Sequence, residues 1–386
     1  MSTRPLLMIP GPIEIEAGVQ VAMARGSLSH LDPEFMQAFS RVLTRSRDVF
    51  GAPTGQPFVI AGSGTLAMEM AAANLVERGD AALVIDTGFF GDRMARILER
   101  HGATVTRVGG VLGAASSIDE VSAALASSGA TIVTITHVDT STGVLAPVRE
   151  YAALARERGA LVIVDGVCSV GGEDLRMDEW GVDLALTASQ KALGAPPGLA
   201  VLVAGPRAME KWRARKTPVG AFYVDFGEWL PVMEAYEHGR VAYFGTPPVQ
   251  LIAALDASLA SLVAEGMDTR CDRHRRIAHA FRSAWTALEL QMLPINESVT
   301  AHTLSAVYYP QGVDAALVAR VREHGVVIAG GLHPAARTKY FRVGHMGSTG
   351  LPEILTTVGA VERALAASGW SAAMSGRGVA AAEKAW

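Results

Sequence analysis

A lysine on a short loop and an aspartate that ends an apolar run are the residues of this sequence best suited to catalysis. Lys191 lies in the segment Ser-Gln-Lys-Ala-Leu-Gly-Ala-Pro-Pro-Gly, and Asp165 ends the run Leu161–Asp165, 26 positions earlier. A lysine amine can form a Schiff base with an aldehyde, and a carboxylate can keep a pyridine nitrogen protonated. The pair therefore predicts a site for pyridoxal 5'-phosphate (PLP), although a lysine in such a turn can also be an ordinary surface residue.

A glycine-rich turn offers a second element of such a site. Ala61-Gly62-Ser63-Gly64-Thr65 joins an expected strand to an expected helix. Glycines let an anion approach the backbone, and the free N–H groups at a helix start favour phosphate. Alone, the turn could be a plain connection with an N-cap. Beside a Schiff-base lysine, it predicts phosphate binding.

Residues after other expected strands could surround a flat cofactor ring. Phe90, in the segment Asp86–Gly91, could stack on one face, or it could be a core phenylalanine at a helix start. Val167, two residues past Asp165, could pack on the other face. Thr140 could hydrogen-bond the phenolic oxygen or the phosphate of the cofactor.

Several further residues have ordinary structural explanations beside the functional one. His137 could act as a general base, yet a histidine at a strand end is commonly structural, and Lys191 can move the proton itself. Cys168 is more typical of a small buried residue than of a nucleophile. Thr246 is expected to cap the following helix, with Pro247 in the first helical position.

The local sequence gives no structural reason for Tyr243, and it allows either a structural or a substrate-binding role for Arg342. Arg342 lies in the segment Lys339–Gly347, which is otherwise apolar at its centre. An arginine in such a setting commonly pairs within the protein or binds a carboxylate with two hydrogen bonds. The local sequence leaves both roles open.

The framework expected for these residues is an α/β fold. Apolar runs rich in β-branched residues alternate with helix-period segments from about residue 55 to 205, which predicts a mostly parallel seven-stranded sheet flanked by helices. In such sheets, ligands bind beyond the carboxyl ends of the strands, where Ser63, Thr87, His137, Asp165 and Ser189 all fall. The expected strands are Pro57–Ala61, Ala81–Ile85, Thr104–Val108, Thr131–Thr136, Ala160–Val164, Leu184–Thr187 and Leu199–Ala204, and the expected helices are Leu66–Arg78, Gly91–Arg100, Ile118–Ala126 and Val148–Arg158.

Long helical patterns after residue 247 predict a smaller α+β domain at the C-terminal end. We divide the chain into an N-terminal arm (1–14), a large cofactor-binding domain (15–265) and a small domain (266–386). The Ala/Gly-rich tail, 368–386, is expected to be peripheral. The expected elements are helices Val249–Glu265, Arg270–Leu288, Val313–His324 and Pro352–Ala367, and a strand at Leu304–Tyr308.

Composition narrows the classes of function. The 386 residues carry a formal net charge of −4 without a long basic run, so nucleic acid is not an expected partner. Hydrophobic residues make up 49% and charged residues 19%, which favours burial and self-association. Two cysteines form neither a disulfide framework nor a metal-ligand pattern. Without a membrane-length apolar run or a secretory core, we expect a cytoplasmic protein with no metal and no membrane contact.

Taken together, the motifs resemble those of the class V (fold-type I) PLP-dependent aminotransferases, specifically the alanine–glyoxylate and serine–glyoxylate aminotransferase group. The segment Ser189–Gly198 is close to diagnostic for that group, and the stretch from Trp229 to Leu251 is similar to microbial alanine–glyoxylate enzymes. Matching segments run along nearly the whole chain: Pro10–Pro12, Ser29–Phe35, the glycine-rich turn, Thr136–Gly143, Val164–Gly172, Tyr243–Pro248 and Phe341–Gly347.

The resemblance implies a role for each candidate residue and a homodimer with shared sites. Lys191 would bind the cofactor and serve as nucleophile and acid/base, and Asp165 would be the partner of the pyridinium nitrogen. The other implied roles are Phe90 and Val167 on the two ring faces, Thr140 near the ring hydroxyl, Ser63, Gly64, Thr65 and Gln190 at the phosphate, Tyr243 and Thr246 at the phosphate of the neighbouring subunit, and Arg342 with Gly11 at the substrate carboxylate.

The implied activity is ping-pong transfer of an amino group from L-alanine or L-serine to glyoxylate. Phe90 stands where the family often has tryptophan, and Thr65 where some members have histidine, which leaves the donor open. No second arginine for a dicarboxylic donor is evident, although Arg25 could serve. The alternatives are a specialised aminotransferase with an unusual amine donor, a PLP-dependent lyase such as a cysteine desulfurase with Cys271 as its nucleophile, and a non-catalytic PLP-binding protein.

Overall fold

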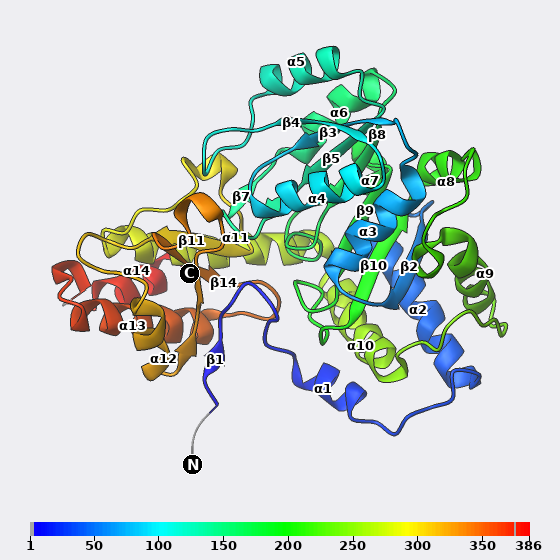
Figure 1. Ribbon diagram of the computed structural model, residues 1–386. Coiled ribbons are helices and arrows are strands. Elements are labelled where there is room, and N and C mark those ends of the chain that lie inside the picture. Colours follow the sequence, from blue (N-terminus) through cyan, green and yellow to red (C-terminus); the bar gives the residue numbers. More distant parts are fainter. Residues whose placement is uncertain (1–3, 374–375) are drawn as a thin grey trace.

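The computed structural model describes residues 4–373 and 376–386, so residues 1–3 of the predicted arm and 374–375 of the predicted tail lie outside it. Its largest sheet has seven strands: β2 (Gln56–Ala61), β3 (Ala81–Ile85), β4 (Thr104–Val108), β5 (Ile132–Thr136), β8 (Leu161–Asp165), β9 (Leu184–Ala188) and β10 (Leu199–Ala204). Their order is β2-β10-β9-β8-β5-β3-β4 (Figure 1). β10 is antiparallel to β2 and β9, and all other neighbours are parallel. The predicted mostly parallel, seven-stranded sheet is therefore confirmed.

The centre of this sheet is buried because its strands are apolar on both faces. β8 and β9 are buried at every residue, whereas the edge strand β4 is partly exposed. Parallel strands of this kind require helices on both faces. α3 packs on β9 and β10, α4 on β3 and β4, and α6 on β8. The covering helices are α3 (Gly64–Leu75), α4 (Phe89–Arg100), α5 (Ile118–Ser128), α6 (Val148–Glu157) and the short α7 (Met177–Trp180) and α8 (Pro206–Arg213).

Four more helices form a layer beside β2 and β10. They are α1 (Ala17–Met23), α2 (Pro33–Phe50), α9 (Phe226–Glu237) and α10 (Val249–Glu265), and α10 packs on both α1 and α2 (Figure 1). In this layer, α2 and α9 pack on β2. α2 begins at Pro33 because Asp32 caps it by accepting a hydrogen bond from the Glu34 N–H at 2.8 Å.

The C-terminal part forms a second hydrophobic core around α11 (Met267–Ala287) and α13 (Leu351–Ala367). A three-stranded antiparallel sheet joins β11 (Leu304–Tyr308), β14 (Tyr340–Gly344) and β13 (Ala329–Gly330). β1 (Leu6–Leu7) of the N-terminal arm pairs in parallel with β12 (Val326–Val327) of this part. The remaining strands and α-helices of the described residues are β6 (Val138–Asp139), β7 (Val144–Leu145), α12 (Leu317–Glu323) and α14 (Arg377–Ala385). The three-part domain division stays a prediction.

α10 and α11 meet at Gly266 with an angle of 88° between them. No single helix in the described ranges is long and apolar enough to cross a membrane. Taken together, α10 and α11 would be long and apolar enough, but they are bent against each other.

Three sequence expectations are wrong in detail. Thr246 does not cap α10, which begins at Val249, because Pro248 disfavours a helical conformation at Pro247. The helix expected at Val313–His324 begins only at Leu317, after a turn. The tail is not peripheral: α14 packs on α11 and α13, and Ala382 is fully buried, because small residues permit close helix contact.

Candidate active site

Lys191 lies on the loop between β9 and β10, at the carboxyl end of β9. Ser189 closes this loop, because its hydroxyl donates to the Pro196 carbonyl at 2.6 Å and accepts from the Leu199 N–H at 3.2 Å. The lysine is only 9% exposed, and its amine donates to the Pro10 carbonyl. Burial, the largest effect, and the nearby Arg342 charge lower the pKa of Lys191, and together they outweigh the opposing effects of Cys168 and Asp165. The lowered pKa favours the neutral amine, which is the nucleophilic form.

Asp165 is the last residue of β8, the parallel neighbour of β9, so it lies at the same edge of the sheet as Lys191. Its carboxylate accepts a hydrogen bond from the Val167 N–H at 3.0 Å. Burial raises the pKa of Asp165 to about 6, and the charge of Lys191 acts in the opposite direction. A protonated ring nitrogen beside this carboxylate would keep it ionised.

The glycine-rich turn has the form expected of an anion site. α3 begins at Gly64, and the Ser63 side chain makes no capping hydrogen bond. The first N–H groups of the helix therefore have no acceptor within the helix. A Cβ at Gly64 would lie 2.9 Å from Val167, so only glycine lets the two predicted cofactor residues approach each other. These features fit a phosphate held by the turn.

Phe90 is held by a buried aspartate that the sequence analysis missed. The Phe90 N–H donates to Asp139 at 2.9 Å, and the same carboxylate accepts from the Ser141 N–H at 2.8 Å. Asp139 is fully buried, and burial raises its pKa. The only sequence signal for this role is its place beside Thr140 at a strand end.

Arg93, also missed, lies against the same part of the site. Its guanidinium donates to the Thr65 hydroxyl at 2.8 Å and lies 4.8 Å from the centre of the Phe90 ring. Its charge also counters the burial effect on Asp165. Arg93 lies three residues after Phe90, so one helix face carries both side chains.

Arg342 connects the small sheet to the strand-end residues. Its Nε donates to the Gly330 carbonyl at 2.9 Å, and one Nη donates to the Thr140 carbonyl at 3.1 Å. The second Nη makes no hydrogen bond within residues 4–373 and 376–386. An arginine held in this way has donors left for a carboxylate.

The N-terminal arm lies directly on the lysine loop. Gly11 has a φ of 109°, and a Cβ there would lie 2.6 Å from the Lys191 Cδ. The Ile13 N–H donates to the Gln190 carbonyl at 3.2 Å. The Gln190 side-chain oxygen is buried and has no partner among the described residues, so its amide has capacity for a bound group.

Tyr243 and Thr246 are not gathered with these residues in one protomer. Tyr243 is 65% exposed, and its hydroxyl lies 3.5 Å from that of Thr246, which is also exposed. Neither makes a hydrogen bond to Lys191, Asp165 or Ser63 within the part of the chain that the structure describes.

His137 and the two cysteines have structural settings. The buried His137 ring lines a separate cavity of about 240 Å³ with Glu173 and His302, and burial lowers its pKa to about 4. Cys168 is 1% exposed. Cys271 lies within α11, and burial raises its pKa to about 12, which is unsuited to a thiolate nucleophile. Among the residues described, no cluster of three His, Cys, Asp or Glu side chains is placed to hold a metal ion.

A buried lysine beside a strand-end carboxylate, a phosphate-type turn and an arginine is the arrangement of a PLP-dependent enzyme. The chain belongs to the class-V aminotransferases: the family model described as "Aminotransferase class-V" matches residues 17–349. This membership confirms the resemblance seen in the sequence.

Named relatives agree with this family. Alanine–glyoxylate aminotransferase 1 of Saccharomyces cerevisiae is 40% identical over 357 residues, 89% of this chain and 92% of the relative. L-aspartate–glyoxylate aminotransferase of Paracoccus denitrificans is 34% identical, over 100% of this chain and 96% of the relative. The crystal structure of ureidoglycine–glyoxylate aminotransferase from Bacillus subtilis has a TM-score of 0.92 at 25% identity, covering 100% and 98%. The chain is therefore an aminotransferase of the alanine/aspartate–glyoxylate family, whose members use PLP.

Proposed function

We propose that this enzyme transfers the amino group of L-alanine or L-serine to glyoxylate by a ping-pong mechanism. The carrying observation is the geometry of Arg342: its Nε and one Nη donate to the Gly330 and Thr140 carbonyls at 2.9 and 3.1 Å, and its other Nη has no hydrogen bond among residues 4–373 and 376–386. One cation suits the single carboxylate of a small neutral amino acid. The three relatives named above share glyoxylate in their names and differ in the amino donor, so the acceptor is the better supported half of the proposal.

Residues at the carboxyl ends of the strands and in the adjoining loops would hold the cofactor. We assign Ser63, Gly64, Thr65 and Gln190 to the phosphate. Phe90 and Val167 would lie on the ring faces, Thr140 near the ring hydroxyl, and Asp165 at the ring nitrogen. When bound, PLP supplies an electron sink that stabilises negative charge at the substrate α-carbon.

The protein's own groups would carry binding and proton transfer. Arg342 would bind the substrate carboxylate and orient the α-carbon toward Lys191. The neutral Nζ of Lys191 would accept the α-proton and then donate a proton to the bound cofactor rather than back to the α-carbon, with Gly11 leaving room for that movement. Asp165 would hold the proton on the ring nitrogen throughout. Pro10, which accepts a hydrogen bond from Nζ, would help to fix the amine in place.

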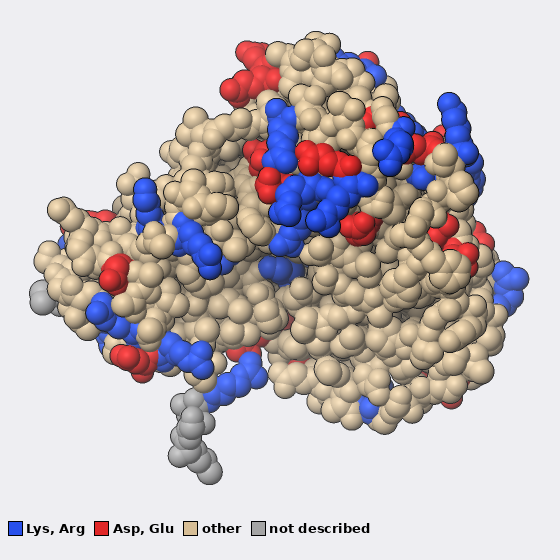
Figure 2. All heavy atoms as spheres, in the orientation of Figure 1, with Lys and Arg blue, Asp and Glu red and all other residues tan. Residues whose placement is uncertain are grey.

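We propose a homodimer in which Tyr243 and Thr246 complete the phosphate site of the partner. Large exposed apolar side chains support such a contact, among them Val21 (64%), Phe222 (71%) and Tyr243 (65%). Figure 2 shows few charged side chains in the lower right part of the face in view, where Figure 1 places α1 and α10. A cytoplasmic location stays a prediction.

A donor with a second carboxylate is the main competing assignment, because one relative is named for L-aspartate. Arg25, the residue considered for that role, lines a cavity between α1, α2 and α10, away from the lysine loop. Arg93 is engaged at the predicted cofactor residues, because it donates to the Thr65 hydroxyl and lies over the Phe90 ring. A cysteine desulfurase activity is disfavoured by the buried position of Cys271.

Steady-state assays with L-alanine, L-serine and L-aspartate, each paired with glyoxylate, test the proposal. We expect turnover with alanine or serine and much slower turnover with aspartate. If glycine forms with aspartate as donor but not with alanine or serine, the donor assignment is wrong. If no donor converts glyoxylate to glycine, the acceptor assignment is wrong.

A further inference from the structure

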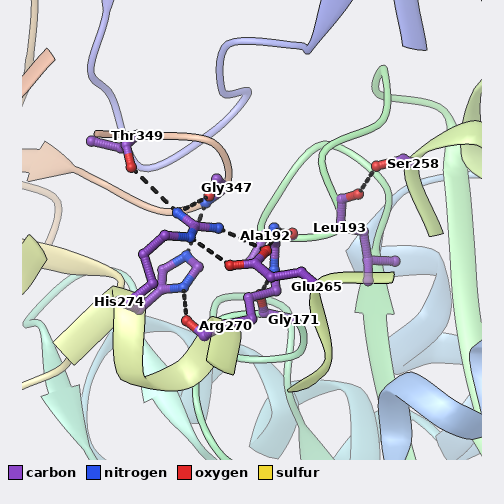
Figure 3. Close-up of polar contacts among 10 residues, drawn as sticks. Gly171, Ala192, Leu193, Ser258, Glu265, Arg270, His274, Gly347 and Thr349 are labelled. Atoms are coloured by element: carbon purple, nitrogen blue, oxygen red, sulfur yellow. Dashed lines mark hydrogen bonds and ion pairs between the residues drawn. The ribbon is translucent and has the colours of Figure 1, made fainter. Parts of the chain in front are cut away.

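Outside the site, one polar cluster contacts the loop that carries Lys191 and the two loops that follow the strands of Asp165 and Arg342. Glu265, Arg270, Arg273 and His274 lie where α10 meets α11, and we call them the junction cluster (Figure 3). None of them touches Lys191, Asp165 or Arg342 through a hydrogen bond in the described ranges. Their partners are instead backbone groups close to those residues in the chain.

Arg270 joins the aspartate loop to the lysine loop. Its side chain is almost completely buried, and its Nε donates to the Gly171 carbonyl at 2.7 Å. One Nη donates to the carbonyl of Ala192, the residue next to Lys191, at 2.9 Å. A planar guanidinium can hold two such carbonyls in a fixed relative position, and an ammonium group cannot reproduce that geometry.

Ser258 of α10 adds a second contact to the lysine loop, because its hydroxyl donates to the Leu193 carbonyl (Figure 3). The loop that carries the amine is therefore fixed from both helices of the junction.

Arg273 and His274 hold the loop that follows the Arg342 strand. Arg273 donates to the Gly347 carbonyl at 2.9 Å, and the Gly347 N–H donates to the His274 Nε2 at 3.1 Å. The His274 Nδ1 donates to the Arg270 carbonyl at 2.8 Å. These partners require the neutral ring with its proton on Nδ1, in agreement with the lowered pKa that burial gives this histidine.

Glu265 links the two arginines. It accepts from Arg273 Nε at 2.6 Å and from Arg270 Nη1 at 2.8 Å. Burial opposes its charge, but the hydrogen bonds from Arg273 and Arg270 prevail and lower the pKa of Glu265. The cluster is thus a continuous network that connects both cores of the molecule.

We propose that the junction cluster positions Lys191 and Asp165 relative to Arg342, and so sets the distance between the proton-transferring amine and the bound substrate. Arg270 is a positioning residue in this proposal. It acts through the Gly171 and Ala192 carbonyls rather than on reacting atoms. The inference rests on the roles proposed for Lys191 and Arg342.

The variant Arg270→Lys tests the proposal, because it retains the charge and loses the forked geometry. We expect kcat to fall about 10- to 100-fold with little change in KM, since small displacements of a catalytic group cost that much. Amide hydrogen exchange should become faster in residues 166–173 and 189–198 and stay unchanged in β3 and β5. PLP content should stay near that of the wild type.

Arg275→Gln is the matched control, because Arg275 lies on the same helix, is exposed, and forms its ion pair with Asp272. It should leave both kcat and exchange at wild-type values. If Arg270→Lys shows wild-type kcat and exchange, or if exchange rises throughout the large sheet and activity only follows cofactor loss, the proposal is wrong.

Arg273→Gln provides an independent test should Arg270→Lys fail to fold. It should speed exchange in residues 345–350 and raise the KM for the amino donor, and unchanged values of both would overturn the proposal. Exchange is measured without substrate. A failure of the alanine–glyoxylate assignment is therefore distinguishable from a failure of the positioning role.

Discussion

Lys191 and Asp165 are enclosed by their own chain, whereas Tyr243 and Thr246, proposed to serve the cofactor of the partner subunit, face outward. Lys191 is 9% exposed and Tyr243 is 65% exposed. The enclosed half of the site contains the groups that would move protons and bind the substrate. The open half contains only hydroxyl groups that could hold a phosphate. In the proposed dimer, one protomer would hold the reactive groups, and the hydroxyl groups of its partner would complete the phosphate site.

The largest expected effect comes from removing the amine of the enclosed half. Lys191→Ala should lower kcat with alanine and glyoxylate by at least about 10²–10⁴-fold, because the proton-transferring group is lost. Sedimentation should show the same assembly as the wild type. Near-wild-type multiple turnover in this variant would remove Lys191 from the mechanism.

A substitution at Arg342 should affect substrate binding more than cofactor binding. Arg342→Lys should raise the KM for the amino acid by roughly 10- to 100-fold, because a charged hydrogen-bonding pair is weakened. The visible absorption of the bound cofactor should stay unchanged. An unchanged KM together with a loss of PLP would instead place Arg342 at the cofactor.

Hybrid dimers compare the two halves directly. Thr246→Ala should weaken PLP binding by roughly 10- to 100-fold, the value of one hydrogen bond to a charged group. If Thr246 serves the partner, an equal mixture of Thr246→Ala and Lys191→Ala chains contains hybrids with one intact site. At limiting PLP, such a mixture should recover about one quarter of wild-type activity after subunit exchange. No recovery would place Thr246 in the site of its own chain or outside the site.

The smallest expected effect is a pH-dependent change in stability at Asp165. Because burial raises the pKa of this carboxyl from 3.8 to about 6, the folded PLP-free protein binds the proton more tightly than the unfolded chain does. Its contribution to stability is therefore present at low pH and is lost as the pH rises through about 6.

In PLP-free protein, Asp165→Asn should therefore raise the free energy of unfolding at pH 7 by on the order of 1–3 kcal/mol, and the gain should vanish near pH 4. Urea unfolding at the two pH values checks this. An Asp165→Asn variant that is less stable than the wild type at pH 7 would contradict the assigned burial cost.

The sequence predicts the large sheet within about one residue, because buried parallel strands are short apolar runs between turn residues. It also predicts that Ser63, Asp165 and Lys191 share one edge, since each follows a strand. Asp139, Arg93 and Arg270 were missed because their partners are distant in the chain. Asp139 contacts Phe90 from 49 residues away, and Arg270 contacts Ala192 from 78 residues away. No local pattern distinguishes such contacts from surface charges.

The visible spectrum of the purified protein, recorded before and after addition of L-alanine, tests the central claim most directly. We predict a bound-cofactor band that alanine bleaches and glyoxylate restores, as a reversible amino-group transfer at Lys191 requires. A band that neither alanine nor serine changes would contradict the proposed donors. Absence of any band after PLP is added would contradict the assignment of Lys191 itself.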